Sequence, residues 1–147
     1  MKRIPLISPI LFVLFLSNAL LAQEPSQNAK QPQRIAVSDL KKKLDSGEKF
    51  LLIDVREDWE LEKEGAIPGA IHIPVAELDQ RMKDIPKDVE IVFYCAAGGR
   101  ASRAADKFLK AGYKAGPFCG INDWKKENQK VAEKADRPAE GPVQPNK

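Results

Sequence analysis

Residues 90–103 read Glu-Ile-Val-Phe-Tyr-Cys-Ala-Ala-Gly-Gly-Arg-Ala-Ser-Arg, and this stretch decides the fold. Glu90–Tyr94 is a nearly continuous apolar run, which is typical of a strand buried on both faces of a sheet. Small residues fill positions 96–99, and a helix with one apolar stripe begins at about Arg100 and is stopped by Gly112. A buried strand that turns directly into a helix indicates an α/β fold with a parallel sheet.

The same alternation of strands and helices continues on both sides of this unit. Phe50–Val55 is a second continuous apolar run and predicts another buried strand. The order of elements predicts an α/β domain whose central, mostly parallel sheet has about five strands and helices on both faces. The other expected strands are Arg34–Val37, Ala70–Ile73 and Lys114–Phe118, and the other expected helices are Ser38–Gly47, Glu57–Glu64, Val75–Ile85 and Asn122–Lys130.

The N-terminus has the pattern of a secretory signal peptide over residues 1–22. Lys2 and Arg3 precede an apolar run centred on Ile10–Leu16, and small residues follow up to Ala22. An uncleaved membrane anchor is disfavoured because the apolar run is short. We therefore expect an exported protein, either periplasmic or secreted.

The remaining chain divides into three parts. Residues 23–33 are rich in Gln and Pro and predict a flexible linker, and residues 34–130 form the folded domain. Residues 131–147 contain prolines and few large apolar groups, so we expect a disordered tail. We find no internal repeat, and 147 residues are enough for one compact domain.

Charge and residue inventory exclude several classes of function. The net charge is +3, and without Lys2 and Arg3 the 22 basic and 21 acidic side chains leave +1. Nothing in this balance predicts nucleic acid or, after signal cleavage, a membrane as partner. The chain has two cysteines and one histidine, which cannot complete a four-ligand Cys/His zinc site. We expect no metal and no cofactor.

The turn after the strand at 90–94 is the candidate site. Ligands of open α/β sheets bind beyond the C-terminal ends of the strands. The small residues Ala96, Ala97, Gly98 and Gly99 let backbone N–H groups turn inward together, and such a nest at a helix N-terminus attracts anions.

Cys95 stands at the mouth of this nest. Its thiolate would be favoured by the helix dipole and by Arg100, with Arg103 one helical turn further on as a possible accessory. On position alone, a small buried cysteine that ends a strand is an equally good reading. The nucleophilic reading requires a Cys95 sulfur that is ionised and reachable, with amide hydrogens converging on it.

Several stretches in order resemble the single-domain rhodanese (thiosulfate sulfurtransferase-like) family. Ile53–Glu60 and Gly65–Pro74 resemble its first signature, Tyr94–Arg100 resembles its active-site loop, and the helix Ala101–Gly112 and Gly120–Trp124 resemble the segments after that loop. Each motif alone is weak, but together they span about 35–127 at the usual spacing. The resemblance implies the rhodanese-like fold and a sulfurtransferase activity.

The resemblance also implies residue roles and a substrate class. Cys95 would attack the outer sulfur of thiosulfate or of a persulfide donor, and the resulting persulfide would pass its sulfur to cyanide or to a thiol. Ala96, Ala97, Gly98, Gly99 and Arg100 would bind the substrate. The six-residue stretch Cys95–Arg100 has the length of the sulfurtransferase branch, whereas the phosphatase-like branch has a longer loop with Arg where this chain has Ala101.

Some residues depart from the family pattern or stay open. Ala66 and Ala96 replace residues that are usually polar, which leaves the physiological donor open. The family places Cys119 near Cys95, so a structural disulfide, a reversible disulfide or persulfide relay, and an independent thiol are all considered. Asp54 and Arg56 end a strand near the site, where they either tune it or form a buried ion pair.

Two classes of function are considered. The first is an enzyme, a thiosulfate sulfurtransferase that acts on a small sulfur donor with a thiol or cyanide acceptor. The second is a non-catalytic sulfur-carrier or redox interaction module of the cell envelope, with a thiol redox protein as partner. In either case we expect a monomer.

Overall fold

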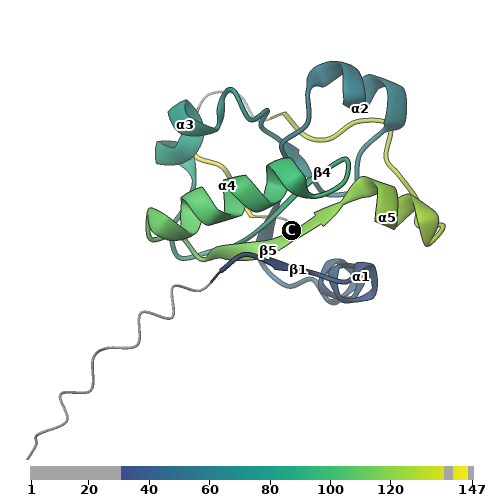
Figure 1. The fold of residues 1–147 in the computed structure, drawn as a ribbon, viewed down its shortest axis with the longest axis horizontal. Coiled ribbons are helices and arrows are strands. Elements are labelled where there is room, and N and C mark those ends of the chain that lie inside the picture. Colours follow the sequence, from purple (N-terminus) through teal and green to yellow (C-terminus); the bar gives the residue numbers. More distant parts are fainter. Residues whose placement is uncertain (1–30, 138–140, 146–147) are drawn as a thin grey trace, which may run out of the picture.

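The computed structural model describes residues 31–137 and 141–145, so the predicted signal peptide and most of the predicted linker lie outside the described residues. Five parallel strands form one sheet in the order β1-β5-β4-β2-β3 (Figure 1). This confirms the predicted α/β class and the predicted sheet. The elements are β1 Gln33–Arg34, α1 Val37–Ser46, β2 Phe50–Asp54, α2 Asp58–Glu64, β3 Ile71–His72, α3 Leu78–Arg81, the 3-10 turn η1 Met82–Asp84, β4 Glu90–Cys95, α4 Gly99–Lys110, β5 Ala115–Gly120 and α5 Ile121–Lys126.

The sheet separates two apolar cores. Side chains alternate along a strand, so neighbouring residues of β2 and β4 enter opposite layers. Ile53 and Phe93 pack with α3 and α4, whereas Leu52, Val92 and Tyr94 pack with α1 and α5. Figure 1 shows α1 and α4 separated by β5 and β1. Among the described residues, no helix has the length and apolar character needed to cross a membrane.

Helix α4 packs closely on the sheet and fixes the direction of the loop before it. Its buried stripe is mostly alanine, which lets the helix axis approach β4 and β5. Phe108 meets Phe93 edge-on, with ring centroids 4.9 Å apart. The helix begins after Gly98, whose φ of 101° is left-handed and favours glycine.

Several predicted boundaries differ from the structure. Helix α1 begins at Val37 after Ala36, without a side-chain cap from Ser38. The expected helix over 75–85 is only α3 followed by η1, and Val75 is exposed instead of facing the core. Strand β5 extends to Gly120 because it stays hydrogen-bonded to β4 as far as Cys95.

The C-terminal segment contradicts the expectation of a disordered tail wherever the structure describes it. Ala132 forms an antiparallel bridge with Ala66, and Asp136 pairs with the edge strand β3. Val143 is buried in the core beside α3 and α4 and donates its N–H to the carbonyl of Asp84 at 2.8 Å. The segment is ordered because an edge strand offers unpaired backbone groups, a property that composition does not reveal.

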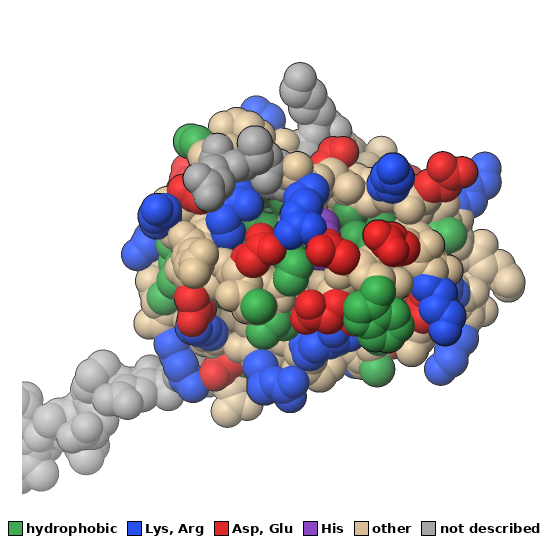
Figure 2. Space-filling model, turned by 90° about the horizontal axis from the view of Figure 1, so that it is seen from above, with side chains coloured by type: hydrophobic (Ala, Val, Ile, Leu, Met, Phe, Trp, Pro, Cys, Tyr) green, Lys and Arg blue, Asp and Glu red, His purple; other side chains and the backbone are tan. Residues whose placement is uncertain are grey.

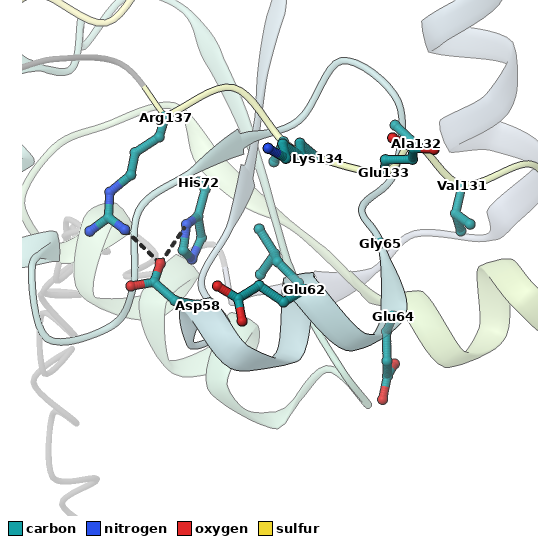
Figure 3. A pocket seen from close by; sticks show the side chains of 12 residues that line it. Asp58, Glu62, Glu64, Gly65, His72, Val131, Ala132, Glu133, Lys134 and Arg137 are labelled. Carbon is teal, nitrogen blue, oxygen red and sulfur yellow. Dashed lines mark hydrogen bonds and ion pairs between the residues drawn. The ribbon is translucent and has the colours of Figure 1, made fainter.

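A groove of about 820 Å³ lies between α2 and this segment. His72, the only histidine of the chain, is visible there among acidic and basic side chains (Figure 2). Figure 3 shows Asp58 between Arg137 and His72, with its Oδ1 2.5 Å from Arg137 Nη1 and 3.4 Å from His72 Nδ1. The His72 Nε2 donates to the carbonyl of Arg56 at 2.7 Å, so both ring nitrogens have partners. These contacts make His72 a structural residue that ties β3 to α2.

Gly65 is the position where a side chain would break the contact between α2 and the C-terminal segment. Its φ of 70° favours glycine, and an added Cβ would lie 2.5 Å from the carbonyl oxygen of Ala132. We expect Gly65→Ala to lower the free energy of unfolding by about 2–4 kcal/mol, from backbone strain plus the clash. The control Gly47→Ala has a similar φ of 68° with no atom near the added Cβ, and should cost about 1–2 kcal/mol. Urea unfolding measures both, and equal losses would contradict the role of the clash.

Candidate active site

Cys95 is the last residue of β4, at the end of the sheet where the strands meet their helices. It is paired in register with Gly120 of β5. Its Sγ accepts a hydrogen bond from the backbone N–H of Gly98 at 3.1 Å. The chain therefore closes a tight turn around the sulfur and points the Gly98 amide at it, whereas the sequence predicts a nest of several amides that converge there.

The loop carbonyls point away from the sulfur and are held there. The carbonyl of Ala96 accepts from the N–H of Asn122 at 3.1 Å, and that of Ala97 accepts from both terminal nitrogens of Arg34 at 3.2 Å. The loop also lies directly on Gly120, where a Cβ would come within 2.7 Å of the Ala96 oxygen. Only glycine allows this approach, so β5 sets the height of the loop above the sheet.

The sulfur is less reachable than the sequence predicts. Cys95 is only 2% exposed and packs in the core cluster that contains Ala101 and Ala104 of α4. Ala97 and Gly99 on the loop surface are exposed. The physical reason is that the short alanine side chains bring α4 close to the sheet. Only a slender atom could therefore approach this sulfur.

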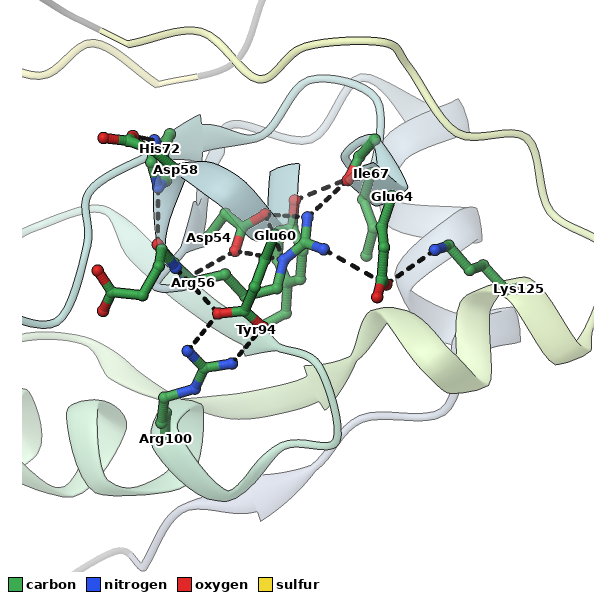
Figure 4. Close-up of polar contacts among 12 residues, drawn as sticks. Asp54, Arg56, Asp58, Glu60, Glu64, Ile67, His72, Tyr94, Arg100 and Lys125 are labelled. Carbon is green, nitrogen blue, oxygen red and sulfur yellow. Dashed lines mark hydrogen bonds and ion pairs between the residues drawn. The ribbon is translucent and has the colours of Figure 1, made fainter. Parts of the chain in front are cut away.

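Arg100 is held beside the loop by an ion pair that the sequence did not predict. Its two terminal nitrogens each lie 2.6 Å from an oxygen of the Glu60 carboxylate on α2 (Figure 4). The same carboxylate accepts the backbone N–H of Glu57 at 3.0 Å and so closes the capping box of α2. Glu60 thus joins the N-terminus of α2 to the first turn of α4.

This pair fixes the charge of both partners. Hydrogen bonds from Arg100 are the main cause that lowers the pKa of Glu60, and burial opposes them. The hydrogen bonds to Glu60 likewise raise the pKa of Arg100, and the nearby Cys95 sulfur adds to this rise. Arg100 is therefore a permanent cation in the first turn of α4, five residues after Cys95, and Glu60 already occupies its two terminal nitrogens.

Arg103 lines a hollow of about 200 Å³ between α3 and α4. Arg100 and Lys107 line the same hollow, and Asp79 pairs with Lys107 there. The hollow is also bordered by Val75, Leu78 and Ala104. Arg103 is exposed, and Arg100 and Lys107 are paired with Glu60 and Asp79, so Arg103 is the cation that leaves this recess next to the first turn of α4 with a net positive charge.

Asp54 and Arg56 form a buried ion pair. Both side chains are 0% exposed, and Arg56 Nη2 lies 2.7 Å from Asp54 Oδ2 and 2.6 Å from the carbonyl oxygen of Gly65 (Figure 4). Burial works against the charge of Arg56, yet the hydrogen bonds to Asp54 prevail and its pKa is raised. Burial, together with the charge of Asp54, raises the pKa of Tyr94 well above its usual value, and Tyr94 accepts the N–H of Ile67 at 3.1 Å. These contacts fix the ends of α2.

Cys119 is separated from Cys95 by the sheet itself. It pairs with Tyr94 rather than with Cys95, and its side chain joins the core on the α1 and α5 side. Both cysteines are free. Burial raises the pKa of Cys119 to about 12, so this thiol stays protonated at neutral pH. Of the three readings considered for Cys119, the structure supports the independent thiol.

Two residues of the site were missed from the sequence. The spacing of Glu57 and Glu60 fits a capping box and could have indicated where the helix starts. It could not have indicated the contact of Glu60 with Arg100, which lies 40 positions further along the chain. Arg34 contacts Ala97 across 63 positions, and no local pattern could have indicated that.

Comparison with known proteins places this geometry in a family. Residues 36–127 match the model described as "Rhodanese-like domain". The chain is 36% identical over 104 residues to "Putative sulfur carrier protein YrkF" of Bacillus subtilis, which covers 69% of this chain and 56% of that protein. It is 38% identical over 82 residues to "Putative sulfurtransferase YtwF" of the same organism, which covers 56% and 79% of the two chains.

A solved structure agrees with both the fold and the extent of the match. The crystal structure of a rhodanese-related protein from Thermoplasma volcanium aligns with a TM-score of 0.61 at 27% identity, covering 70% of this chain and 98% of that one. The strand that ends in Cys95, the small-residue loop and α4 all lie inside the matched region. The chain thus belongs to the rhodanese-like domain family.

Proposed function

We propose that the protein is a sulfurtransferase that moves a sulfane sulfur through a persulfide on Cys95. The observation that carries the proposal is the Gly98 N–H directed at the Cys95 sulfur at 3.1 Å, next to the cationic Arg100. An amide donor and a fixed cation stabilise a thiolate, and they would equally stabilise a persulfide anion. The family supports the reaction class, and the curated relatives support a role in sulfur transfer.

The first step transfers sulfur to the enzyme. With thiosulfate as donor, the Cys95 thiolate attacks the outer sulfur and forms a new S–S bond. The S–S bond within thiosulfate breaks, and its electron pair leaves with sulfite. With a persulfide donor the leaving group is a thiolate, and no external oxidant or reductant is needed.

The second step regenerates the thiolate. A cyanide ion or an acceptor thiolate attacks the terminal sulfur of the persulfide, and the electron pair of the broken S–S bond returns to Cys95. The products are thiocyanate or an acceptor persulfide. Charge balance is kept in both steps, because one anion enters as another leaves.

The burial of Cys95 supports a sulfane sulfur as substrate. At 2% exposure, the residue admits a small terminal atom more readily than a tetrahedral phosphate. The short stretch of six residues from Cys95 to Arg100 likewise favours a sulfane sulfur over a bulkier phosphate. Given the predicted signal peptide, we propose that this reaction takes place outside the cytoplasm, in the periplasm or the extracellular medium.

A sulfur carrier is the second candidate, favoured by the name of one relative. A carrier would load one sulfur atom per chain and hand it to a partner protein without turnover on small acceptors. Cyanide separates the two cases, because an enzyme produces thiocyanate far beyond one equivalent per chain. The chain spans 56% of that relative's length, so the relative's own role does not decide the question.

Cys95→Ser tests the assignment of the nucleophile. We expect thiosulfate to increase the mass of the wild-type protein by one sulfur atom and the variant to gain nothing, since a serine hydroxyl forms no persulfide. Sulfite release should fall to background in the variant. Cys119→Ala is the matched control and should keep both the mass gain and the turnover, because its thiol lies on the other side of the sheet. Persulfide loading on Cys95→Ser would refute the assignment.

Glu60→Gln tests the pair that holds Arg100. The pKa of Glu60 is lower in the folded protein than its value of about 4.3 in the unfolded chain, so the ionised carboxylate stabilises the fold above about pH 4.3. This stabilisation is lost as the pH falls through the folded-state pKa. We expect the variant to lose about 1–2 kcal/mol of unfolding free energy near pH 7, and the difference from wild type to shrink toward about pH 3. Urea unfolding at several pH values measures this. Glu62→Gln, an exposed carboxylate of the same helix, should show little change at either pH.

Arg103→Gln tests the positive hollow as the place of the donor's anionic end. We expect the KM for thiosulfate to rise about two- to fivefold with kcat little changed, as for the loss of one partly exposed charge contact. Steady-state assays at low salt measure this, since screening weakens the effect at high salt. Lys110→Gln removes a charge from the same helix outside the hollow and should leave the KM unchanged. Equal effects of the two substitutions would assign the change to net charge alone.

A further inference from the structure

We propose that Arg34 is a positioning residue of the active site: it holds the carbonyl of Ala97 outward so that the N–H of Gly98 faces the sulfur of Cys95. Arg34 lies on β1, the edge strand, and precedes the region 36–127 that matches the family. The consequence of this positioning for turnover rests on the proposed function, whereas its consequence for the reactivity of Cys95 does not.

One peptide group links Arg34 to Cys95. The Ala97 carbonyl and the Gly98 N–H belong to the same trans peptide, so they point in opposite directions. Both terminal nitrogens of Arg34 donate to that carbonyl at 3.2 Å, and the N–H on the other side donates to Cys95 Sγ at 3.1 Å. Turning the peptide would break the bonds on both sides at once.

Arg34 is itself fixed from three sides. Its guanidinium forms an ion pair with Asp123 of α5 and stands 5.8 Å from the ring centroid of Phe118. A Cβ at Gly98 would lie 2.6 Å from its Nη1, so the guanidinium packs directly against the loop. A planar group with several donors can hold the carbonyl and the carboxylate together, which a lysine cannot do as well.

Apart from its packing on Gly120 and its bond to the Cys95 sulfur, the Ala97–Gly98 peptide is held by Arg34. The neighbouring carbonyl of Ala96 accepts a hydrogen bond from the backbone N–H of Asn122, so it is held without any side chain. Ala97 is exposed, and its methyl group offers no polar contact. Among the described residues, Arg34 supplies every hydrogen bond found on the Ala97 carbonyl.

Other side chains among the described residues also lie near Cys95. They are Arg100 from α4, with Glu60 of α2 behind it, and the thiol of Cys119 from β5. None of these contacts Arg34 by a hydrogen bond. Arg34 also carries a charge of its own close to the loop, so Asp123→Asn, which keeps that charge, separates an effect through the loop amide from a direct effect of the charge.

The experiment uses the full chain with Cys119→Ala as background, so that Cys95 is the only thiol. We compare Arg34→Gln, Arg34→Lys and Asp123→Asn. In Arg34→Gln we expect kcat for sulfur transfer from thiosulfate to fall about tenfold with a smaller change in KM, because one charge-assisted hydrogen bond is misaligned rather than removed. We also expect the midpoint of the pH profile of Cys95 alkylation by iodoacetamide to move to higher pH. Arg34→Lys should restore part of both effects.

Asp123→Asn and Lys43→Gln complete the design. Asp123→Asn keeps the Arg34 guanidinium but removes the carboxylate that holds it. This variant should therefore shift the alkylation profile in the same direction as Arg34→Gln, but by less. If Arg34→Gln does not fold, Asp123→Asn provides the test of the proposal. Lys43→Gln breaks an ion pair with Glu90 at the opposite end of β4 and should leave the profile unchanged. A folded Arg34→Gln, or Asp123→Asn in its place, with a wild-type alkylation profile would overturn the proposal. If the wild type transfers no sulfur but Arg34→Gln still shifts the profile, the proposed function fails and the positioning role stands.

Discussion

The close contact between the Cys95–Gly98 turn and β5 is the constraint on which the site depends. Gly120 has no side chain, so the backbone of Ala96 and Ala97 rests on it. From that position the Ala96 carbonyl reaches the first turn of α5, and the strand register keeps Cys95 beside Gly120. A bulkier residue at 120 would lift the loop and move the amides away from the sulfur. The direction of the loop thus follows from packing between neighbouring strands, before any charge is considered.

The position of Arg100 is then fixed by a series of contacts that begins in the interior. The Asp54–Arg56 pair, buried at the end of β2, also holds the carbonyl of Gly65 and so fixes both ends of α2. Glu60 lies within that helix and holds Arg100. Burying an ion pair costs desolvation energy, which good hydrogen-bond geometry offsets. In this protein the buried pair orients α2, and Glu60 of α2 in turn holds Arg100 in place.

Apolar runs and small-residue turns predicted the central strands, the α/β class and the position of Cys95, because these depend on local sequence. Contacts between distant segments were not predictable in this way. The pairing of Glu60 with Arg100 and of Arg34 with Ala97 depends on how whole elements meet. The predicted end of β5 at Phe118 was two residues short, and the full strand shows that Cys119 faces the opposite core from Cys95.

The segment around Ala132–Asp136 has a further consequence for the chain as a whole. β3 is the last strand of the sheet, and a bare edge strand is a template for pairing with other molecules. The segment bonds to the backbone of Ala66, Ala70 and His72 and occupies that template, while the opposite edge, β1, is only two residues long. The C-terminal segment thereby covers an edge that could otherwise pair with another molecule. Removing it would expose that edge, although its residues take no part in the proposed chemistry.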